Sequence, residues 1–399
     1  MNSIPRSLRL HIGIFGRCNV GKSSLINALS GQGLAIVSDV AGTTTDSVVK
    51  SMEIGPLGAC VLIDTAGIDD STPLGDKRRE QSLRAAEKCD MAIMLCGATE
   101  EYALEREWMQ IFVDRKVPVL VVLGKCDMLI DPEVRASKIE QELGVRPLLW
   151  HNSSPKHRDE LLAALVAMRP EEAVERTIVG DLVSEGDIVV LVMPQDASAP
   201  KGRIILPQVQ TIRELLDRRV SPVCCVPEEL ERVLGGLNGA PRLIITDSQV
   251  FGYVAERVPD GSMLTSFSVL MAAYKGDVVA FKEGARAIDS LTESSRVLIA
   301  EACTHAPATE DIGRVKLPAM LRKRVGKGLQ IDVVGGADFP MDLSGYDLVI
   351  HCGACMFTRA HVLSRLSYAS AQRVPMTNYG IAIAHLTGIL DRVVMPGGC

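Results

Sequence analysis

A run of eight residues near the start of the chain constrains its fold more than any other feature. Residues 16–23, Gly-Arg-Cys-Asn-Val-Gly-Lys-Ser, follow the pattern Gly-x-x-x-x-Gly-Lys-Ser and stand between the apolar run Leu10–Phe15 and an amphipathic segment at 23–29. A strand, a glycine-rich turn and a helix in this order let backbone N–H groups turn inward around an anion. The pattern therefore predicts a phosphate-binding loop at the start of a helix.

Short apolar runs alternate with amphipathic segments along the whole chain. Runs at 59–63, 91–95 and 117–123 indicate further strands, and the segments 79–88 and 104–115 have helical periodicity. The run 117–123 is apolar throughout, as expected for a strand buried on both faces. This alternation predicts the α/β class, with a parallel sheet and helices on both of its faces.

A chain of 399 residues is too long for one ordinary core. The periodic pattern weakens at 169–177, and a second alternating unit follows, with strands expected at 187–193, 223–226 and 242–246 and helices at 208–218, 228–234 and 248–256. A third unit follows 259–261, with strands expected at 297–300 and 347–350. We predict a P-loop domain at 1–172, followed by two smaller α/β domains at 173–262 and 263–399.

The residues around the loop match the needs of a nucleoside triphosphate and its metal. Lys22 is placed to reach the β- and γ-phosphates, and the Ser23 hydroxyl is placed to bind Mg²⁺. Asp64-Thr65-Ala66-Gly67 follows a predicted strand, which puts Asp64 near the metal and the Gly67 amide near the γ-phosphate. Between these motifs, the run 42–46 is expected to be a switch loop that offers a hydroxyl to the metal.

The base is expected to be recognised after the run 117–123. Asp127, in Lys125-Cys126-Asp127, supplies a carboxylate for the N1–H and the exocyclic amine of guanine. Gly124 stands where the usual pattern has Asn, so we expect weaker nucleotide affinity with guanine still preferred over adenine. Ser153 and Ser154 resemble a loop that backs the base. We predict that GTP or GDP contacts Gly16, Asn19, Val20, Gly21, Lys22, Ser23, Ser24, Asp64, Gly67, Lys125, Asp127 and Ser153.

The composition argues against several classes of partner. A formal net charge of −6 does not favour a protein that binds nucleic acid or an anionic membrane. Arg6 and Arg9 are not followed by an uninterrupted apolar segment, so we expect no secretory signal. No apolar run approaches the roughly 20 residues that span a bilayer. We expect a cytoplasmic protein with no nucleic acid and no membrane among its partners.

Three of the eleven cysteines stand close to histidines in two tight clusters. Cys303-Thr304-His305 and His351-Cys352-Gly353-Ala354-Cys355 each follow an apolar run, and adjacent parallel strands end at the same edge of a sheet. One interpretation is buried small side chains with ordinary polar histidines. A structural zinc site with three thiolates and one histidine is another. The third is an iron–sulfur cluster on three cysteines, and spacing alone does not separate iron from zinc.

The P-loop domain resembles the TrmE/Era group of GTPases, in which Gly-x-Thr-Thr-Arg-Asp is typical of the switch loop. Thr45 stands here in place of the Arg. The resemblance implies that Thr44 is the switch ligand of Mg²⁺ and that Asn19 helps to bind an activating K⁺. Ile68 stands where Ras-like enzymes carry a water-orienting Gln, which implies slow hydrolysis. The catalytic residues implied are Lys22, Thr44, Asp64 and Gly67.

This domain combined with the two cysteine clusters resembles the HydF family, the GTPase maturation factors of [FeFe]-hydrogenase. The resemblance extends over all three predicted domains. It implies that the second domain mediates dimerisation and that the third binds a [4Fe–4S] cluster through Cys303, Cys352 and Cys355. His305 and His351 match histidines whose role as ligands varies in the family.

The same resemblance implies a function and a set of partners. The protein would be a GTP-hydrolysing scaffold that receives a 2Fe precursor made with two radical-SAM maturases and delivers it to apo-[FeFe]-hydrogenase. It would work as a homodimer or a higher homo-oligomer. The alternatives are a TrmE/Era-like GTPase that acts on RNA and a zinc-stabilised regulatory GTPase. The acidic balance and the lack of a basic module with aromatic residues disfavour the RNA alternative.

Overall fold

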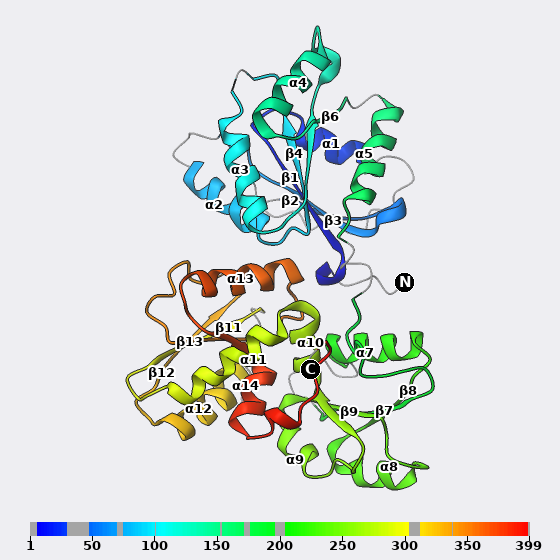
Figure 1. Cartoon of the computed structure of the whole chain (residues 1–399), viewed down its shortest axis with the longest axis vertical. Helices are drawn as coiled ribbons and strands as arrows, with labels where there is room; N and C mark the ends of the chain where they lie inside the picture. The colour runs from blue at the N-terminus through cyan, green and yellow to red at the C-terminus, as the bar shows by residue number, and fades with distance from the viewer. Residues whose placement is uncertain are drawn as a thin grey trace. The chain divides into compact units, whose positions relative to one another are not determined.

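The computed structural model describes residues 6–29, 48–69, 75–99, 101–151, 154–170, 176–195, 204–302, 312–336 and 338–397. The chain divides into two compact units, residues 1–175 and 176–399, and Figure 1 labels the elements of each. Thr44, Ser153, Cys303 and His305 lie outside the described residues. The roles expected for these four residues therefore stay predictions.

The first unit is built on a sheet whose described strands are six, in the order β2-β3-β1-β4-β5-β6. All neighbours are parallel except β2, which runs antiparallel to β3. The strands are β1 (Leu10–Phe15), β2 (Val48–Ile54), β3 (Gly58–Asp64), β4 (Met91–Cys96), β5 (Val119–Leu123) and β6 (Leu148–Leu149). The helices are α1 (Lys22–Leu29), α2 (Gly75–Ala86), α3 (Ala103–Asp114), α4 (Pro132–Leu143) and α5 (Pro155–Ala167).

Successive residues of the central strands enter different cores on the two faces of this sheet. Ile12 and Ile14 of β1 pack in one hydrophobic cluster, whereas Phe15 packs in the other with Trp108 and Phe112 of α3. Both faces are therefore buried, as the continuous apolar runs predicted. The predicted strands β1, β3, β4 and β5 are confirmed to within two residues at each end.

The second unit contains two parallel sheets. Their described strands have the orders β10-β9-β7-β8 and β12-β11-β13-β14. The first comprises β7 (Ile188–Val192), β8 (Ser221–Cys225), β9 (Leu243–Thr246) and β10 (Met263–Ser266), with α7 (Leu206–Asp217), α8 (Leu230–Gly236), α9 (Phe251–Ala255) and α10 (Phe267–Lys275). The second comprises β11 (Arg296–Glu301), β12 (Gln330–Gly335), β13 (Leu348–His351) and β14 (Met376–Asn378), with α11 (Val278–Arg286), α12 (Leu317–Val325), α13 (Arg359–Ala371) and α14 (Tyr379–Leu386).

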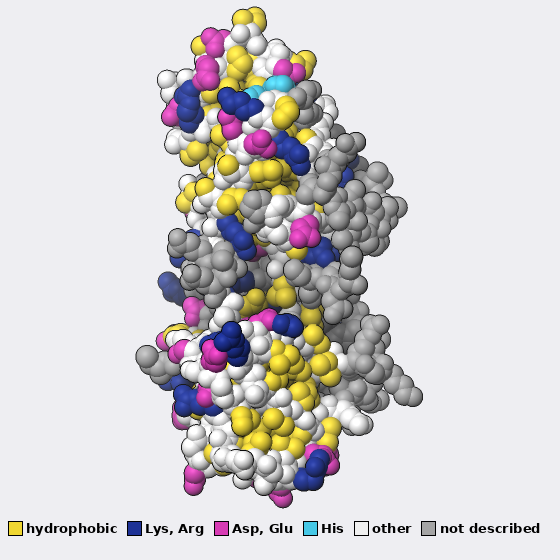
Figure 2. All heavy atoms as spheres, turned by 90° about the vertical axis from the view of Figure 1, so that its right-hand side faces the viewer, with side chains coloured by type: hydrophobic (Ala, Val, Ile, Leu, Met, Phe, Trp, Pro, Cys, Tyr) yellow, Lys and Arg dark blue, Asp and Glu magenta, His cyan; other side chains and the backbone are white. Residues whose placement is uncertain are grey.

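Figure 2 shows apolar side chains gathered on one face of this second unit. Among its exposed apolar residues are Val209 and Leu216 of α7, which are 44% and 50% exposed. Cys224 of β8 is exposed as well. Across the described parts of the chain, no helix is long and apolar enough to cross a bilayer.

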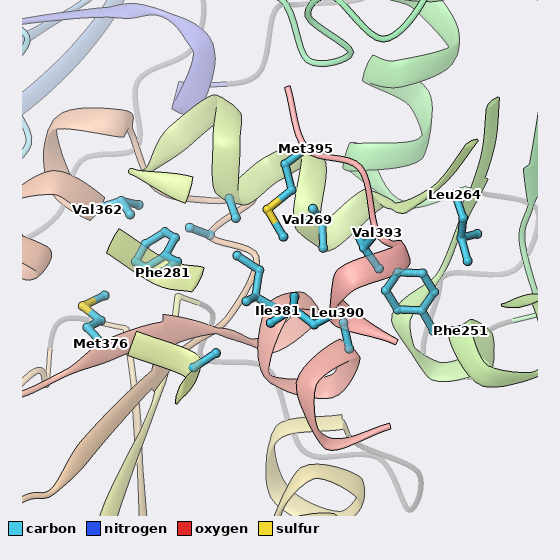
Figure 3. Close-up of a cluster of buried hydrophobic side chains, with 14 of the residues drawn as sticks. Phe251, Leu264, Val269, Phe281, Val362, Met376, Ile381, Leu390, Val393 and Met395 are labelled. Carbon is cyan, nitrogen blue, oxygen red and sulfur yellow. The ribbon is translucent and has the colours of Figure 1, made fainter. Parts of the chain in front are cut away.

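The two sheets of the second unit share one hydrophobic core, shown in Figure 3. Phe251 and Leu264 come from the β7–β10 half, and Phe281, Val362 and Met376 come from the β11–β14 half. β10 begins at residue 263, where the third predicted domain begins, yet it pairs with β9 of the preceding sheet. We propose that the boundary between the second and third domains lies after α10.

Candidate functional site

The predicted phosphate-binding loop lies between β1 and α1. Gly16 and Gly21 have φ angles of 152° and 109°, and Asn19 has a left-handed φ of 61°. A Cβ at residue 16 would lie 2.3 Å from the carbonyl oxygen of Leu95, so glycine is required where the loop passes β4. α1 begins at Lys22, which brings unpaired helix N–H groups to the loop. This is the geometry of a P-loop.

Ser23 and Asp64, the described members of the predicted Mg²⁺ site, lie together at the loop. Ser23 Oγ donates to Oδ2 of Asp64 at 2.8 Å, and a hydroxyl next to a carboxylate offers the oxygen ligands that Mg²⁺ prefers. Lys22 is buried, and its Nζ donates to the carbonyl oxygens of Gly16 at 2.9 Å and Arg17 at 2.8 Å. Burial lowers the pKa of Lys22, and the charge of Asp64 opposes this shift.

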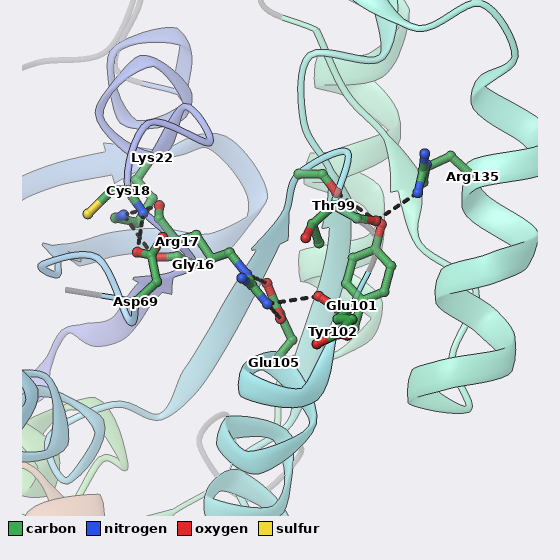
Figure 4. A network of polar contacts seen from close by, with 11 residues as sticks. Gly16, Arg17, Cys18, Lys22, Asp69, Thr99, Glu101, Tyr102, Glu105 and Arg135 are labelled. Carbon is green, nitrogen blue, oxygen red and sulfur yellow. Dashed lines mark hydrogen bonds and ion pairs between the residues drawn. The ribbon is translucent and has the colours of Figure 1, made fainter. Parts of the chain in front are cut away.

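The segment after β3 lies directly against the P-loop, as Figure 4 shows for Asp69 and Cys18. The Cys18 N–H donates to Oδ1 of Asp69 at 2.7 Å, and the Ile68 N–H donates to the Gly16 carbonyl at 3.2 Å. A Cβ at residue 67 would lie 2.2 Å from Sγ of Cys18 and 2.8 Å from its nitrogen. Gly67 therefore permits this close approach. Burial alone would raise the pKa of Asp69, but hydrogen bonds, chiefly from Cys18, and the charge of Arg17 together outweigh it and lower the pKa.

An ion pair with a buried carboxylate holds the P-loop against α3. Arg17 donates from Nε and Nη2 to the two carboxylate oxygens of Glu105 at 2.7 Å and 3.0 Å, and from Nη2 to the Glu101 carbonyl at 2.8 Å. Glu105 is 0% exposed, and its side chain raises the pKa of Arg17. This pair was not predicted. Its signal in the sequence is a carboxylate three and seven residues before Trp108 and Phe112, in the apolar stripe of the helix.

The loop that follows β5 packs on the P-loop through Gly124. A Cβ at this residue would lie 2.8 Å from the carbonyl oxygen of Val20, so the Asn of the usual pattern would force the two loops apart. Lys125 follows with a left-handed φ of 54°, Cys126 is buried, and Asp127 is exposed. Gly124, in place of the usual Asn, thus allows the two loops to contact each other directly. Lys125 and Asp127 lie on this loop as predicted.

The strands that lead to the two cysteine clusters are neighbours, as predicted. β11 and β13 pair in parallel, and the Cys352 N–H donates to the Ala300 carbonyl at 2.9 Å. The Cys352 Sγ accepts hydrogen bonds from the N–H groups of Ala302 at 3.0 Å and Ala354 at 3.4 Å. Ala302, the last described residue before Cys303, thus contacts the second cluster directly.

The loop that carries Cys352 and Cys355 turns at Ala354, whose φ is 53°. Neither of these cysteines forms a disulfide. Burial raises the pKa of Cys352 to about 11, although the two N–H groups bound to its sulfur act in the opposite direction. The described residues hold no group of three or more His, Cys, Asp and Glu arranged for a metal, and they include only two of the three predicted cysteine ligands.

In the part of the chain that is described, two buried cations lie next to this loop. Lys275, at the end of α10, is 2% exposed, and its Nζ donates to loop carbonyls. Arg365 of α13 is 4% exposed, and its Nη1 lies 3.0 Å from Nε2 of His351. Neither was predicted, because neither belongs to a motif.

His351 was predicted as a candidate metal ligand, and the structure places it inside the protein. Its Nδ1 lies 2.9 Å from the Cys352 carbonyl oxygen, and its Nε2 faces Arg365. Burial, and then the charge of Arg365, lowers the pKa of His351 to about 3. Because both ring nitrogens already have partners, a metal would have to displace Arg365, and we do not include His351 among the proposed ligands.

The fold and the nucleotide site define the class first: the N-terminal unit contains a P-loop GTPase domain. Residues 11–125 match the family model described as 50S ribosome-binding GTPase. Residues 178–276 match the hydrogen maturase F dimerization domain, and residues 279–396 match the hydrogen maturase F tetramerization domain. The chain therefore belongs to the hydrogen maturase F (HydF) family, and its two assembly domains mark it as a protein that forms homo-oligomers.

Relatives of the GTPase domain are found in several bacteria. The tRNA modification GTPase MnmE of Desulfitobacterium hafniense (strain Y51) is 36% identical over 138 residues, which are 34% of this chain and 29% of that protein. The GTPase Der of Desulforamulus reducens is 30% identical over 185 residues, 43% of this chain and 42% of that protein. The chain thus spans less than half the length of these two relatives. A crystal structure of Aquifex aeolicus Era bound to GDP and AlF4⁻ shares 20% identity, covering 54% of this chain and 92% of that one, with a TM-score of 0.33.

Proposed function

We propose that this protein is a GTP-hydrolysing scaffold for [FeFe]-hydrogenase maturation. It holds a [4Fe–4S] cluster, receives the 2Fe precursor of the H-cluster from two radical-SAM maturases, and delivers it to apo-hydrogenase. One observation supports this proposal most strongly. β11 and β13 end side by side, and the Cys352 sulfur there accepts hydrogen bonds from two main-chain N–H groups. Hydrogen bonds to sulfur are a means by which proteins stabilise and tune iron–sulfur clusters.

The residues at this edge fit such a cluster by their chemistry. Cys303, Cys352 and Cys355 would supply three thiolate ligands, and His305 is a candidate for an exchangeable ligand of the remaining iron. A bound metal ion deprotonates a coordinating thiol, which overcomes the raised pKa of Cys352. Three protein thiolates leave one iron that can accept a further group, and this position is the proposed site for the 2Fe precursor.

The nucleotide site acts in this proposal as a switch on partner binding. Ser23, Asp64 and Thr44 hold Mg²⁺, Asn19 contributes to an activating K⁺ site, and Asp127 selects guanine. The buried Ile68 stands where a water-orienting side chain would be, so intrinsic turnover is slow. Nucleotide-driven movement of the segments 40–46 and 67–80 would carry the signal to partners.

The edge of the β7–β10 sheet supports a homodimer. β8 ends this sheet among the described strands, and a sheet edge bordered by exposed apolar side chains favours pairing with another chain. Val209 and Leu216 of the neighbouring α7 are such side chains. The cytoplasm is the proposed location, because a reducing compartment suits the many free cysteines.

Activation of apo-hydrogenase, measured together with GTP turnover, tests the proposal. Cys303→Ala, Cys352→Ala and Cys355→Ala are each expected to abolish activation while GTP turnover stays at the wild-type rate. Lys22→Ala is expected to abolish turnover and to leave the cluster in place. Loss of GTP turnover in all three cysteine variants would contradict the separation of the two sites. A colourless wild-type protein with stoichiometric zinc would support the zinc alternative instead.

A further inference from the structure

The loop that carries Cys352 and Cys355, called here the cysteine loop, is contacted by Lys275 from the neighbouring domain. The Lys275 side chain is 2% exposed, and its Nζ donates to the carbonyl oxygens of Ala354 at 3.0 Å, Cys355 at 3.2 Å and Phe357 at 2.7 Å. An ammonium group has three donors, and each of them meets one carbonyl of the loop. The three contacts fix the path of the chain around Cys355.

The helix that carries Lys275 is anchored in the other sheet. Phe267 and Leu270 of α10 pack in the core beneath the β7–β10 sheet, whereas Val269 and Ala272 pack in the core shared with the β11–β14 sheet. α10 ends the residues matched to the dimerization domain, and the cysteine loop lies in those matched to the tetramerization domain. Lys275 therefore ties the cysteine loop of one domain to a helix of the other.

A second side chain connects the same two domains, and it belongs to the domain that contains the cysteine loop. Arg359, the first residue of α13, donates from Nη1 to the carbonyl oxygen of Gly276, the residue after Lys275. Asn378, before α14, donates from Nδ2 to the Ser268 carbonyl in α10 at 3.0 Å. Side chains of both domains thus join α10 and the residue after it to the domain that contains the cysteine loop.

The charge of Lys275 also favours an anion beside it. A buried ammonium is costly unless an anion or well-placed hydrogen bonds compensate for its lost hydration. Its described hydrogen bonds go to carbonyl dipoles, and the thiols of Cys355 and Cys352 are nearby groups that can become anionic. A [4Fe–4S] cluster with three thiolates is a net anion, and a fixed cation beside it favours reduction because it attracts the added electron.

We propose that Lys275 is a positioning residue for the cluster: it fixes the loop 352–357 on α10 and holds a positive charge beside the cluster that this loop binds. The inference rests on the proposed cluster site. It makes the dimerisation domain part of the environment of the cluster, so that a displacement of α10 is felt directly at the cysteine ligands.

Two substitutions and one control separate the parts of this proposal. Lys275→Met keeps the apolar stem and removes the charge and the donors, whereas Lys275→Arg keeps the charge but not the three-donor geometry. Lys323→Met, at an exposed position of α12, is the matched control. Amide hydrogen exchange of residues 352–357 is measured on the full-length apoprotein, and the midpoint potential is measured after anaerobic reconstitution.

Lys275→Met is expected to accelerate exchange in the loop by about tenfold or more and to shift the cluster potential to a more negative value. Lys275→Arg is expected to accelerate exchange less and to restore the wild-type potential. Lys323→Met should change neither. Wild-type exchange and wild-type potential in Lys275→Met would overturn the proposal.

Folding of each variant is checked by circular dichroism and by oligomer size. If Lys275→Met does not fold, Lys275→Arg decides, and wild-type loop exchange in that variant would overturn the positioning role. A wild-type chain that takes up no iron would contradict the proposed function. The exchange data on the apoprotein would still decide whether Lys275 fixes the loop.

Discussion

Glu105 of α3 has its carboxylate buried in the apolar interior, where it forms an ion pair with Arg17 of the P-loop. The Arg17 side chain is 23% exposed and that of Glu105 is 0% exposed, so the pair is largely shielded from water. Removing one member of such a pair leaves an uncompensated buried charge, which is strongly destabilising. The P-loop is therefore held in place by electrostatics in the interior as well as by its glycines.

Arg17→Ala is expected to lower the free energy of unfolding of the first unit by about 3–5 kcal/mol. Arg79→Ala is the control, because Arg79 and Glu107 form an exposed pair, which is worth about 0–1 kcal/mol. Both tryptophans of the chain, Trp108 and Trp150, lie in the first unit. Denaturant unfolding followed by tryptophan fluorescence therefore reports on this unit, and equal losses in the two variants would contradict the account.

Two buried residues, His11 of β1 and Asp90 before β4, make opposite contributions to the pH dependence of this unit's stability. Burial lowers the pKa of His11 from 6.5 to about 4 and raises the pKa of Asp90 from 3.8 to about 6. From pH 4 to 6.5 the unfolded His11 binds a proton that the folded one does not, so its contribution to stability rises with pH. From pH 3.8 to 6 the folded Asp90 keeps a proton that the unfolded one has lost, so its contribution falls with pH.

The two slopes oppose each other between about pH 4 and 6, so we expect a flat stability profile there in the wild-type protein. In Asp90→Asn the His11 slope remains, and stability should rise by up to about 3 kcal/mol from pH 4 to 6.5. In His11→Gln the stability should fall over pH 4 to 6 instead. Tryptophan-detected unfolding at a series of pH values measures all three profiles. The same slope in both variants would show that the assigned shifts are wrong.

The residues that could be predicted are those whose chemistry is fixed by local spacing. Lys22 and Ser23 follow from the glycine pattern, and the adjacency of β11 and β13 follows from two apolar runs that each precede a cysteine cluster. Lys275 and Glu105 could not be predicted, because their roles depend on which face of a helix meets a distant loop. No local pattern encodes that contact.

At the scale of elements, the segment after β3 is the part of the nucleotide site most sensitive to added volume. Gly67 lies where a Cβ would overlap both the sulfur and the nitrogen of Cys18. Gly67→Ala is therefore expected to push this segment off the P-loop, lowering GTP hydrolysis by about tenfold or more while GDP binding changes little. Single-turnover hydrolysis and GDP titration check this.

Gly97→Ala is a suitable control for that substitution. Its added Cβ would approach only the side chain of Val20, at 3.1 Å. We expect near-normal hydrolysis in this variant, and a similar loss in both variants would mean that the contact between Gly67 and Cys18 has no special role.

Strand prediction succeeded where a strand is buried on both faces, and it missed the shortest strands and every described edge strand except β8. β1, β4 and β5 are continuous apolar runs, which is the pattern of strands in a sheet that is buried on both faces. β2 and β12 border their sheets and mix charged with apolar residues, so their sequences carry little signal. β6 and β14, with 2 and 3 residues, are too short to show any period.

At the scale of the whole molecule, the chain joins a GTPase unit to a second unit in which two sheets share one core. The cysteine loop lies at the edge of one sheet and is held by a helix that packs under the other. The α/β class and the GTPase domain were predicted from the sequence and are confirmed. The core shared by the two later sheets was not predicted, because it depends on contacts between segments more than 100 residues apart, such as those of Ser268 and Asn378.

The central claim is that the edge formed by β11 and β13 binds an iron–sulfur cluster through its cysteines. Anaerobic reconstitution with iron and sulfide, followed by iron analysis and EPR of the reduced protein, tests it most directly. The wild-type chain and Cys224→Ala, which alters an exposed cysteine of the same unit, should each bind about four iron atoms and show the signal of a reduced [4Fe–4S] cluster. Cys352→Ala should lose both. Equal iron content in Cys352→Ala and the wild-type chain would contradict the account.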